Sequence, residues 1–398
     1  MIKRGIALLT VVMLAVAAMA VMSADAQQPI KIGFASSLSG PFTAWGINVR
    51  DGMKLAIAEV NEKGGVLGRP LELVERDDKN NPAEGITTFK FLVEREGIVA
   101  GGGVISSGVG LAVAREAEAL QVPYFLTMSG SHGITKKSSR YTFRTCLPAA
   151  PTVLEPIAEM IKDRKYTRVG AIFADYEWGH ALKASFEKFI VPLPGVKTQV
   201  EVAPVPEKDF TPYLRKMQAL DPELIVATGH PPGNPTITRQ SAELGMKTLV
   251  VGSWYPPEFF VQRAGDAVFD RYVDFSCGDI ASPAYQKLAE KFHATYKRFF
   301  DHNAFSGYVI VRMVADAIRQ ANSADPKAIA AALRTGKFAY EGYGWALSYT
   351  ESGEMKGAQP TLYTFEKGSP PGGINPGASW RPKVLFRSPP SQPYVPTE

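Results

Sequence analysis

Apolar positions in the first part of the chain alternate between two patterns. Short continuous runs predict strands, and apolar residues at helical spacing, such as Val49, Met53 and Val60, predict the helices between them. The predicted strands cover residues 31–35, 71–74, 98–100 and 122–126, and the helices run to about 61, from 82, and over 109–120. Strands and helices that alternate through short connections form a parallel, doubly wound sheet.

The same alternation begins again after residue 147. Predicted strands cover residues 169–173, 197–202, 224–228 and 248–251, with helices over 179–190, 210–219 and 236–244. Residues 141–147 and 275–278 are interpreted as crossings between two sheets. Long helices over 284–300 and 307–322, a shorter piece over 326–335 and a strand near 362–365 follow. The Pro- and Gly-rich end from Gly368 is predicted to be an extended strap with little regular structure.

The predicted fold class is therefore α/β, with two doubly wound parallel-sheet lobes. A chain of this length is too long for one ordinary α/β core and fits two. We expect an N-terminal lobe of residues 27–145 and 278–356, and a C-terminal lobe of residues 146–277 and 357–398 that includes the Pro/Gly-rich tail. Because more than one segment crosses between the lobes, we expect these segments to form a multi-strand hinge. The expected motion is closure of the cleft between the lobes about this hinge.

The first 26 residues have the pattern of a cleaved signal peptide. Lys3 and Arg4 precede an apolar run, and Ala24-Asp25-Ala26 supplies small residues at the cleavage spacing. An uncleaved membrane anchor is the alternative, but the run is short for a membrane span. Export through a cleaved leader places the mature chain, from about Gln27, outside the cytoplasm.

The charge distribution and the absence of known motifs argue against nucleic-acid binding, metal binding and catalysis. Removal of residues 1–26 changes the formal net charge from +5 to +4, and the positive residues are not clustered, so no nucleic-acid partner is expected. The five histidines have no metal-ligand spacing, and the glycines at 101–103 fit neither dinucleotide nor P-loop patterns. Although Ser131 precedes His132, adjacent loop residues seldom face each other. We expect no catalytic residue, no metal and no cofactor.

Only two cysteines occur, Cys146 and Cys277. They are too few for a disulfide-based scaffold and wrongly spaced for a metal site. One bridge between them and two buried thiols both remain open.

Two successive strand ends carry small hydroxyl residues and glycines. Residues 101–108 end in Ser106-Ser107-Gly108, and residues 127–133 contain Ser129-Gly130-Ser131. Carboxyl ends of parallel strands are where open α/β sheets hold ligands. Backbone N–H groups at a helix start and Ser hydroxyls can surround a carboxylate, although Ser and Gly are also ordinary turn residues. A small acid is the predicted ligand.

Several segments together resemble one known family. In chain order they are Ile32–Pro41 with Trp45-Gly46, Asn61–Arg69, Asp77-Asp78, Ser106-Ser107-Gly108, Ser129-Gly130-Ser131, Lys208–Thr211 and Gln240–Gly245. This ordered set resembles the periplasmic leucine/isoleucine/valine-type, or branched-chain amino acid-type, substrate-binding proteins of ABC transporters. The resemblance implies the type I bilobal periplasmic binding fold, a location in the periplasm, a membrane permease as partner and a monomeric carrier without enzymatic activity.

The resemblance also implies which residues bind the ligand. Loop hydroxyls and N–H groups of the first lobe would hold the carboxylate, and aromatic side chains would border and cover the rest. By position, the ligand-binding candidates are Trp45, Ser106, Ser107, Ser129, Gly130, Ser131, Tyr176, Trp178, His230, Trp254 and Tyr255.

One departure from the family pattern concerns the ligand ammonium. Amino-acid binders of this type usually carry an acid on the loop after the strand that ends here at Val251, but that loop reads Gly-Ser-Trp-Tyr-Pro, with no carboxylate before Glu258. A buried ammonium without a counter-charge costs several kcal/mol. We therefore expect an aromatic or otherwise apolar carboxylate that lacks an α-amino group, held between aromatic walls.

Two alternatives remain. In the first, the aromatic residues belong to the core, Glu258 or Asp175 pairs with an ammonium, and the protein binds branched-chain or other hydrophobic amino acids. In the second, the same bilobal fold serves a ligand sensor.

Overall fold

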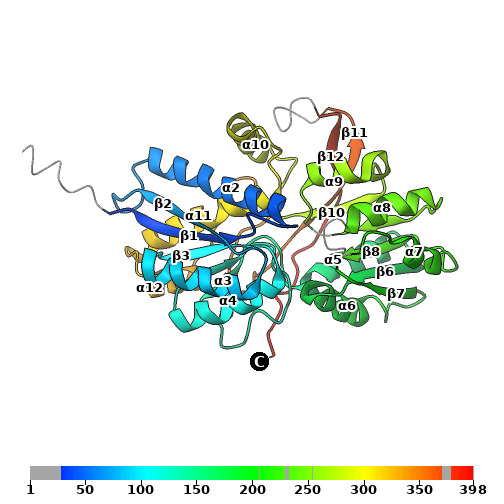
Figure 1. The fold of residues 1–398 in the computed structure, drawn as a ribbon, viewed down its shortest axis with the longest axis horizontal. Coiled ribbons are helices and arrows are strands. Elements are labelled where there is room, and N and C mark those ends of the chain that lie inside the picture. Colours follow the sequence, from blue (N-terminus) through cyan, green and yellow to red (C-terminus); the bar gives the residue numbers. More distant parts are fainter. Residues whose placement is uncertain (1–27, 206, 229–232, 253, 370–377, 398) are drawn as a thin grey trace, which may run out of the picture.

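The protein folds into two α/β lobes that lie side by side (Figure 1). The computed structural model describes residues 28–205, 207–228, 233–252, 254–369 and 378–397. The predicted signal peptide lies outside the described residues. Among the described helices, none combines the length and apolar character that crossing a bilayer requires.

The first lobe is built on a sheet of five parallel strands in the order β2-β1-β3-β4-β5. The strands are β1 (Ile30–Ser36), β2 (Leu71–Asp77), β3 (Ala100–Val104), β4 (Tyr124–Leu126) and β5 (Thr142–Arg144). Its helices are α2 (Thr43–Glu62), α3 (Pro82–Phe91) with a π-helical turn (Leu92–Glu96), α4 (Ser107–Leu120), α10 (Pro283–Tyr296), α11 (His302–Ala321) and α12 (Pro326–Thr335).

The second lobe is built on a seven-stranded sheet in the order β12-β11-β10-β9-β8-β6-β7. The strands are β6 (Arg168–Ala174), β7 (Lys197–Ala203), β8 (Leu224–Thr228), β9 (Leu249–Val251), β10 (Tyr272–Ser276), β11 (Thr361–Lys367) and β12 (Trp380–Arg387). Its helices are α5 (Ala150–Asp163), α6 (Glu177–Phe189), α7 (Thr211–Met217), α8 (Gly233–Glu243), α9 (Pro257–Ala264) and a 3₁₀ turn (Gly265–Val268). The predicted fold class, two parallel doubly wound sheets, is confirmed, with β11 and β12 added antiparallel.

The structure confirms the crossings and corrects two other sequence-based expectations. The chain does pass between the sheets within 141–147 and 275–278, although these segments also contain strand residues of β5 and β10. The tail after Gly368 was expected to lack regular structure, yet β12 pairs with β11 along the edge of the second sheet. Its apolar residues, among them Val384 and Phe386, outweigh the single Pro382, which an edge strand tolerates. Helices α5 and α9 had no counterpart among the predicted elements.

The two cysteines form a disulfide, which settles the alternative that the sequence left open. Cys146 lies just after β5 and Cys277 just after β10. The bridge therefore joins two of the segments that connect the lobes.

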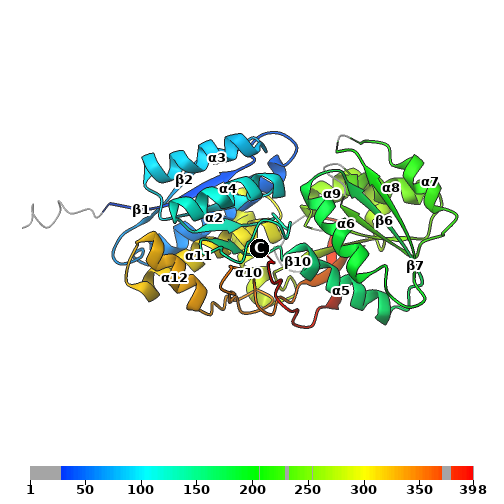
Figure 2. The ribbon, with the colours of Figure 1, turned by 90° about the horizontal axis from the view of Figure 1, so that it is seen from below.

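The last described residues run back from the second lobe toward the first. After β12, the carbonyl of Gln392 accepts a hydrogen bond from Thr152 of α5, and the Tyr394 ring contacts His132 of the first lobe with centroids 5.5 Å apart. Figure 2 shows the C-terminal end between the two lobes.

Candidate ligand-binding site

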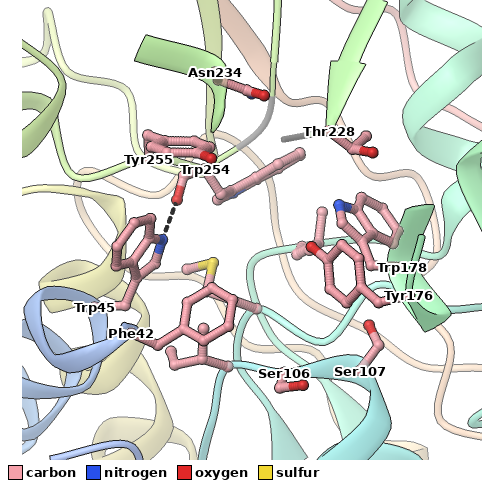
Figure 3. Close-up of a pocket in the computed structure, with 13 residues that line it drawn as sticks. Phe42, Trp45, Ser106, Ser107, Tyr176, Trp178, Thr228, Asn234, Trp254 and Tyr255 are labelled. Atoms are coloured by element: carbon pink, nitrogen blue, oxygen red, sulfur yellow. Dashed lines mark hydrogen bonds between the residues drawn. The ribbon is translucent and has the colours of Figure 1, made fainter. Parts of the chain in front are cut away.

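A cavity lies where the carboxyl ends of the two sheets face each other (Figure 3). Its empty volume is about 490 Å³, the part open to solvent included. The lining residues lie at or after the carboxyl ends of seven different strands: Phe42, Trp45, Ile105, Ser106, Ser107, Met128, Leu147, Tyr176, Trp178, Thr228, Asn234, Trp254 and Tyr255. This is the position at which open α/β sheets bind ligands, because the loops after parallel strands all reach the same edge.

The polar end of the cavity is the start of α4. Ser106 is the N-cap residue, and its side chain makes no capping bond, so the first backbone N–H groups of the helix have no hydroxyl partner there. The Ser107 hydroxyl oxygen accepts a hydrogen bond from the Ser131 N–H at 3.2 Å, which leaves the Ser107 proton to donate to another group. Hydroxyl donors at a helix N-terminus make a local environment that favours an anion.

The opposite wall is aromatic and joins the lobes. Trp45 at the start of α2 donates its indole N–H to the carbonyl of Trp254 at 2.9 Å (dashed in Figure 3). The Trp45 and Tyr255 rings lie 5.2 Å apart in an edge arrangement, and Trp254 stacks on Phe275 at 4.9 Å with 8° between the planes. Such ring pairs contribute on the order of 1 kcal/mol each beyond area burial.

Tyr176 and Trp178 complete the wall at the start of α6. Burial raises the pKa of Tyr176 well above its ordinary value, so the phenol stays neutral. Trp178 packs against the backbone of Gly130, where an added Cβ would lie 2.3 Å from the ring. Glycine at 130 thus permits the close approach of this second-lobe ring to a first-lobe loop.

Seven of the eleven predicted site residues line the cavity, three do not, and one lies outside the described residues. The seven are Trp45, Ser106, Ser107, Tyr176, Trp178, Trp254 and Tyr255. Ser129 donates its hydroxyl to the carbonyls of Ile105 and Ser106 instead. Gly130 lies beneath Trp178, and His230 lies outside the described residues.

Ser131 is occupied by a contact between the lobes. Its hydroxyl donates to Glu177 Oε1 of α6 at 2.5 Å, so it is engaged with a protein carboxylate and is absent from the cavity lining. A carboxylate ligand would have to displace Glu177 to reach this hydroxyl.

The lining residues that the sequence did not single out are Phe42, Ile105, Met128, Leu147, Thr228 and Asn234. All lie at or just after the carboxyl ends of strands, so the predicted topology indicates their position. Their ordinary apolar or small polar side chains gave no chemical signal.

A buried ion pair binds the backbone of the loop that contains Ser129 and Ser131. Arg144 is fully buried, and its Nε lies 2.8 Å from both oxygens of Glu354. Its two terminal nitrogens donate to the carbonyls of Ser129 and Ser131 at 2.6 and 2.8 Å. The pair therefore holds the backbone of this loop and exposes no charge to the cavity.

No Asp, Glu, Lys or Arg occurs among the described residues that line the cavity. Glu258 lines a neighbouring hollow between α2 and α9, and Asp175 is exposed and pairs with His180 at 2.7 Å. Neither of the two carboxylates considered from the sequence therefore borders this cavity. In the described part of the chain there is also no group of three side chains able to hold a metal ion.

The sequence profile described as "Periplasmic binding protein" matches residues 29–361, most of the chain. The chain belongs to the periplasmic binding protein family. The resemblance noted from the sequence motifs is thereby confirmed.

Comparisons with individual proteins also place this periplasmic binding protein in that family. It is 26% identical to the Leu/Ile/Val-binding protein BraC3 of Rhizobium johnstonii over 350 residues, which cover 86% of this chain and 93% of the relative. A leucine-binding protein LivK from Thermotoga maritima matches with a TM-score of 0.76 at 23% identity, covering 91% of this chain and 99% of that one. A solute-binding protein from R. palustris in complex with benzoate matches with a TM-score of 0.75 at 19% identity, covering 92% and 98%. The last two matches show the shared fold.

Proposed function

We propose that this protein is the periplasmic substrate-binding component of an ABC uptake transporter of the branched-chain amino acid type, and that its ligand is an aromatic or apolar carboxylate without an α-amino group. The observation that carries the proposal is the composition of the cavity. Two serines at the start of α4 face aromatic rings, and no charged side chain lies among the described lining residues.

The ligand carboxylate binds at the start of α4. The Ser107 hydroxyl already accepts from Ser131 N–H and therefore donates outward, and Ser106 brings a second hydroxyl. Hydrogen bonds from such groups to a charged acceptor contribute about 1.5–3 kcal/mol. A full counter-charge is not needed, because the helix N-terminus favours an anion.

The apolar part of the ligand lies between the rings of both lobes. Trp45 comes from the first lobe, and Tyr176, Trp178 and Tyr255 come from the second. A ligand stabilises the closed arrangement only through contacts that it makes with both lobes. The closed monomer then presents the ligand to a membrane permease.

An amino-acid ligand is the alternative, and the names of the leucine-type relatives favour it. The benzoate complex of the R. palustris protein supports the aromatic acid. The cavity lining favours the acid, because an α-ammonium would be buried without a carboxylate partner among the described lining residues, at a cost of several kcal/mol.

A thermal-shift panel tests the proposal. Benzoate, 3-phenylpropionate and a hydroxycinnamate are compared with leucine and phenylalanine. Since a ligand that binds the folded state raises the melting temperature, we expect a rise with at least one aromatic acid and none with leucine. In Ser107→Ala we expect this rise to shrink, because about 1–3 kcal/mol of binding free energy is lost with the hydroxyl.

Ser139→Ala is the matched control for this variant. Its hydroxyl accepts from Lys136 N–H in the same lobe, away from the cavity, so the ligand-induced rise should equal that of the wild type. A rise with leucine and with none of the acids would refute the proposed ligand class.

A further inference from the structure

Asp274 is a buried acid directly behind the aromatic wall. It lies in β10 with no exposed surface. Its Oδ1 accepts hydrogen bonds from the backbone N–H groups of Trp254 and Phe275 at 2.5 and 2.7 Å, and its Oδ2 accepts from Tyr255 N–H at 2.9 Å. Both oxygens thus point at the backbone that carries the wall, and Asp274 is not among the residues that line the cavity.

The backbone that Asp274 binds has an unusual conformation. Trp254 has φ +58°, in the left-handed region that bulky residues rarely adopt. In this conformation its carbonyl accepts the indole N–H of Trp45 from the other lobe, and its ring stacks on Phe275. An arrangement of this kind persists only where surrounding contacts hold it, and the bonds to Asp274 lie at this turn.

We propose that Asp274 is a positioning residue for ligand binding: its carboxylate holds the Trp254–Tyr255 turn so that both rings face the cavity and the Trp254 carbonyl meets Trp45. The ligand class rests on the proposed function, but the positioning role does not.

The positioning role predicts that ligand affinity depends on the ionisation of Asp274. Burial raises the pKa of Asp274 to about 7, against the opposing effect of its three backbone hydrogen bonds. The protonated carboxyl has fewer acceptor sites for these N–H groups. As the pH falls from 8 to 6, the Trp254–Tyr255 turn therefore loses hydrogen-bond partners, and a smaller fraction of the molecules has the turn in the conformation that binds ligand. The apparent Kd equals the intrinsic Kd divided by this fraction, so it rises.

Other titratable groups lie near Asp274. Burial raises the pKa of the neighbouring phenols well above 10 and lowers the pKa of His302. Asp301 is bound by Asn48, Asn303 and the N–H of Ala304. The titratable groups that interact electrostatically with Asp274 are Asp301, Tyr255, Tyr272 and Tyr363, and His302 interacts with Asp301 and with the backbone of Trp254.

The test compares Asp274→Asn with wild type by calorimetry between pH 6 and 8, using 3-phenylpropionate and leucine as separate probes. The asparagine NH₂ cannot accept a hydrogen bond, so at least one wall N–H loses its partner. At pH 8 we expect the variant to bind the wild-type's preferred probe at least about tenfold more weakly. The wild type should itself weaken about tenfold from pH 8 to pH 6, and the variant should show no such dependence.

Glu118→Gln is the matched control. Glu118 also accepts two backbone N–H groups, from Arg140 and Tyr141, but it lies at the end of α4 far from Ser107. Its replacement should leave affinity and pH profile unchanged. Both probes stay ionised at the carboxylate in this range, since simple carboxyl groups have a pKa of about 4.

The outcomes separate the two proposals. Tight leucine binding and no binding of 3-phenylpropionate would refute the proposed ligand class, and the Asp274 comparison would then be made on leucine. Wild-type affinity and an unchanged pH profile in Asp274→Asn would overturn the positioning role. Tryptophan fluorescence of the ligand-free protein gives a reading without any probe: it should change between pH 8 and 6 in wild type only, and an identical change in Asp274→Asn would also overturn the role.

Discussion

Glu354→Gln lowers the free energy of unfolding by about 3–5 kcal/mol. Glutamine keeps the shape of the side chain and its bond to Thr135, but it leaves the fully buried Arg144 guanidinium without a counter-charge. Because the same guanidinium donates to the carbonyls of Ser129 and Ser131, the loop beside the ligand site should loosen as well. Urea denaturation followed by circular dichroism measures the loss.

Glu243→Gln is the control for this prediction. Glu243 forms an exposed pair with Arg239 one turn away on α8, and such pairs contribute about 0.3–0.5 kcal/mol. A loss in Glu354→Gln as small as that in Glu243→Gln would show that the buried pair does not hold this part of the fold.

Replacing Cys146 and Cys277 together by serine lowers the free energy of unfolding by about 2–5 kcal/mol. The bridge spans a sequence separation of 131 residues, and a cross-link over a long segment restricts the unfolded chain strongly. Since the bridge joins two of the segments between the lobes, the ligand-bound variant should also occupy a wider range of lobe arrangements than the ligand-bound wild type. Guanidinium titration gives the stability, and small-angle scattering with and without ligand gives the closure.

The reduced wild type is the control for the double variant. Dithiothreitol should bring the wild type to the stability of the variant and leave the variant unchanged. Equal stability of oxidised wild type and variant would contradict the account of the bridge.

The alternation of strands and helices and the aromatic wall could be predicted because they depend on local pattern. Alternating strands and helices place every strand's carboxyl end at one edge, and Trp45, Trp178 and Trp254 follow such ends. The family resemblance and the fold class are confirmed on this basis.

The remaining features depend on how distant segments meet. The Ser131 hydroxyl looked available in the sequence, but Glu177 of the other lobe binds it, which only the arrangement of the lobes decides. Arg144 and Glu354 are 210 positions apart, and no local pattern links them. Asp274 lies within an apolar strand and carried no motif, so its bonds to the wall appear only in three dimensions.

The proposed ligand class depends most on the absence of a carboxylate among the described residues that line the cavity, which leaves an ammonium group there without a counter-charge. 3-Phenylpropionate and phenylalanine share the ring, the chain and the carboxylate, and they differ only in the α-ammonium. Calorimetry of the wild type with both ligands isolates that group. We expect the acid to bind at least about a hundredfold more tightly, since an unpaired buried ammonium costs several kcal/mol. Tighter binding of phenylalanine than of 3-phenylpropionate would contradict the account.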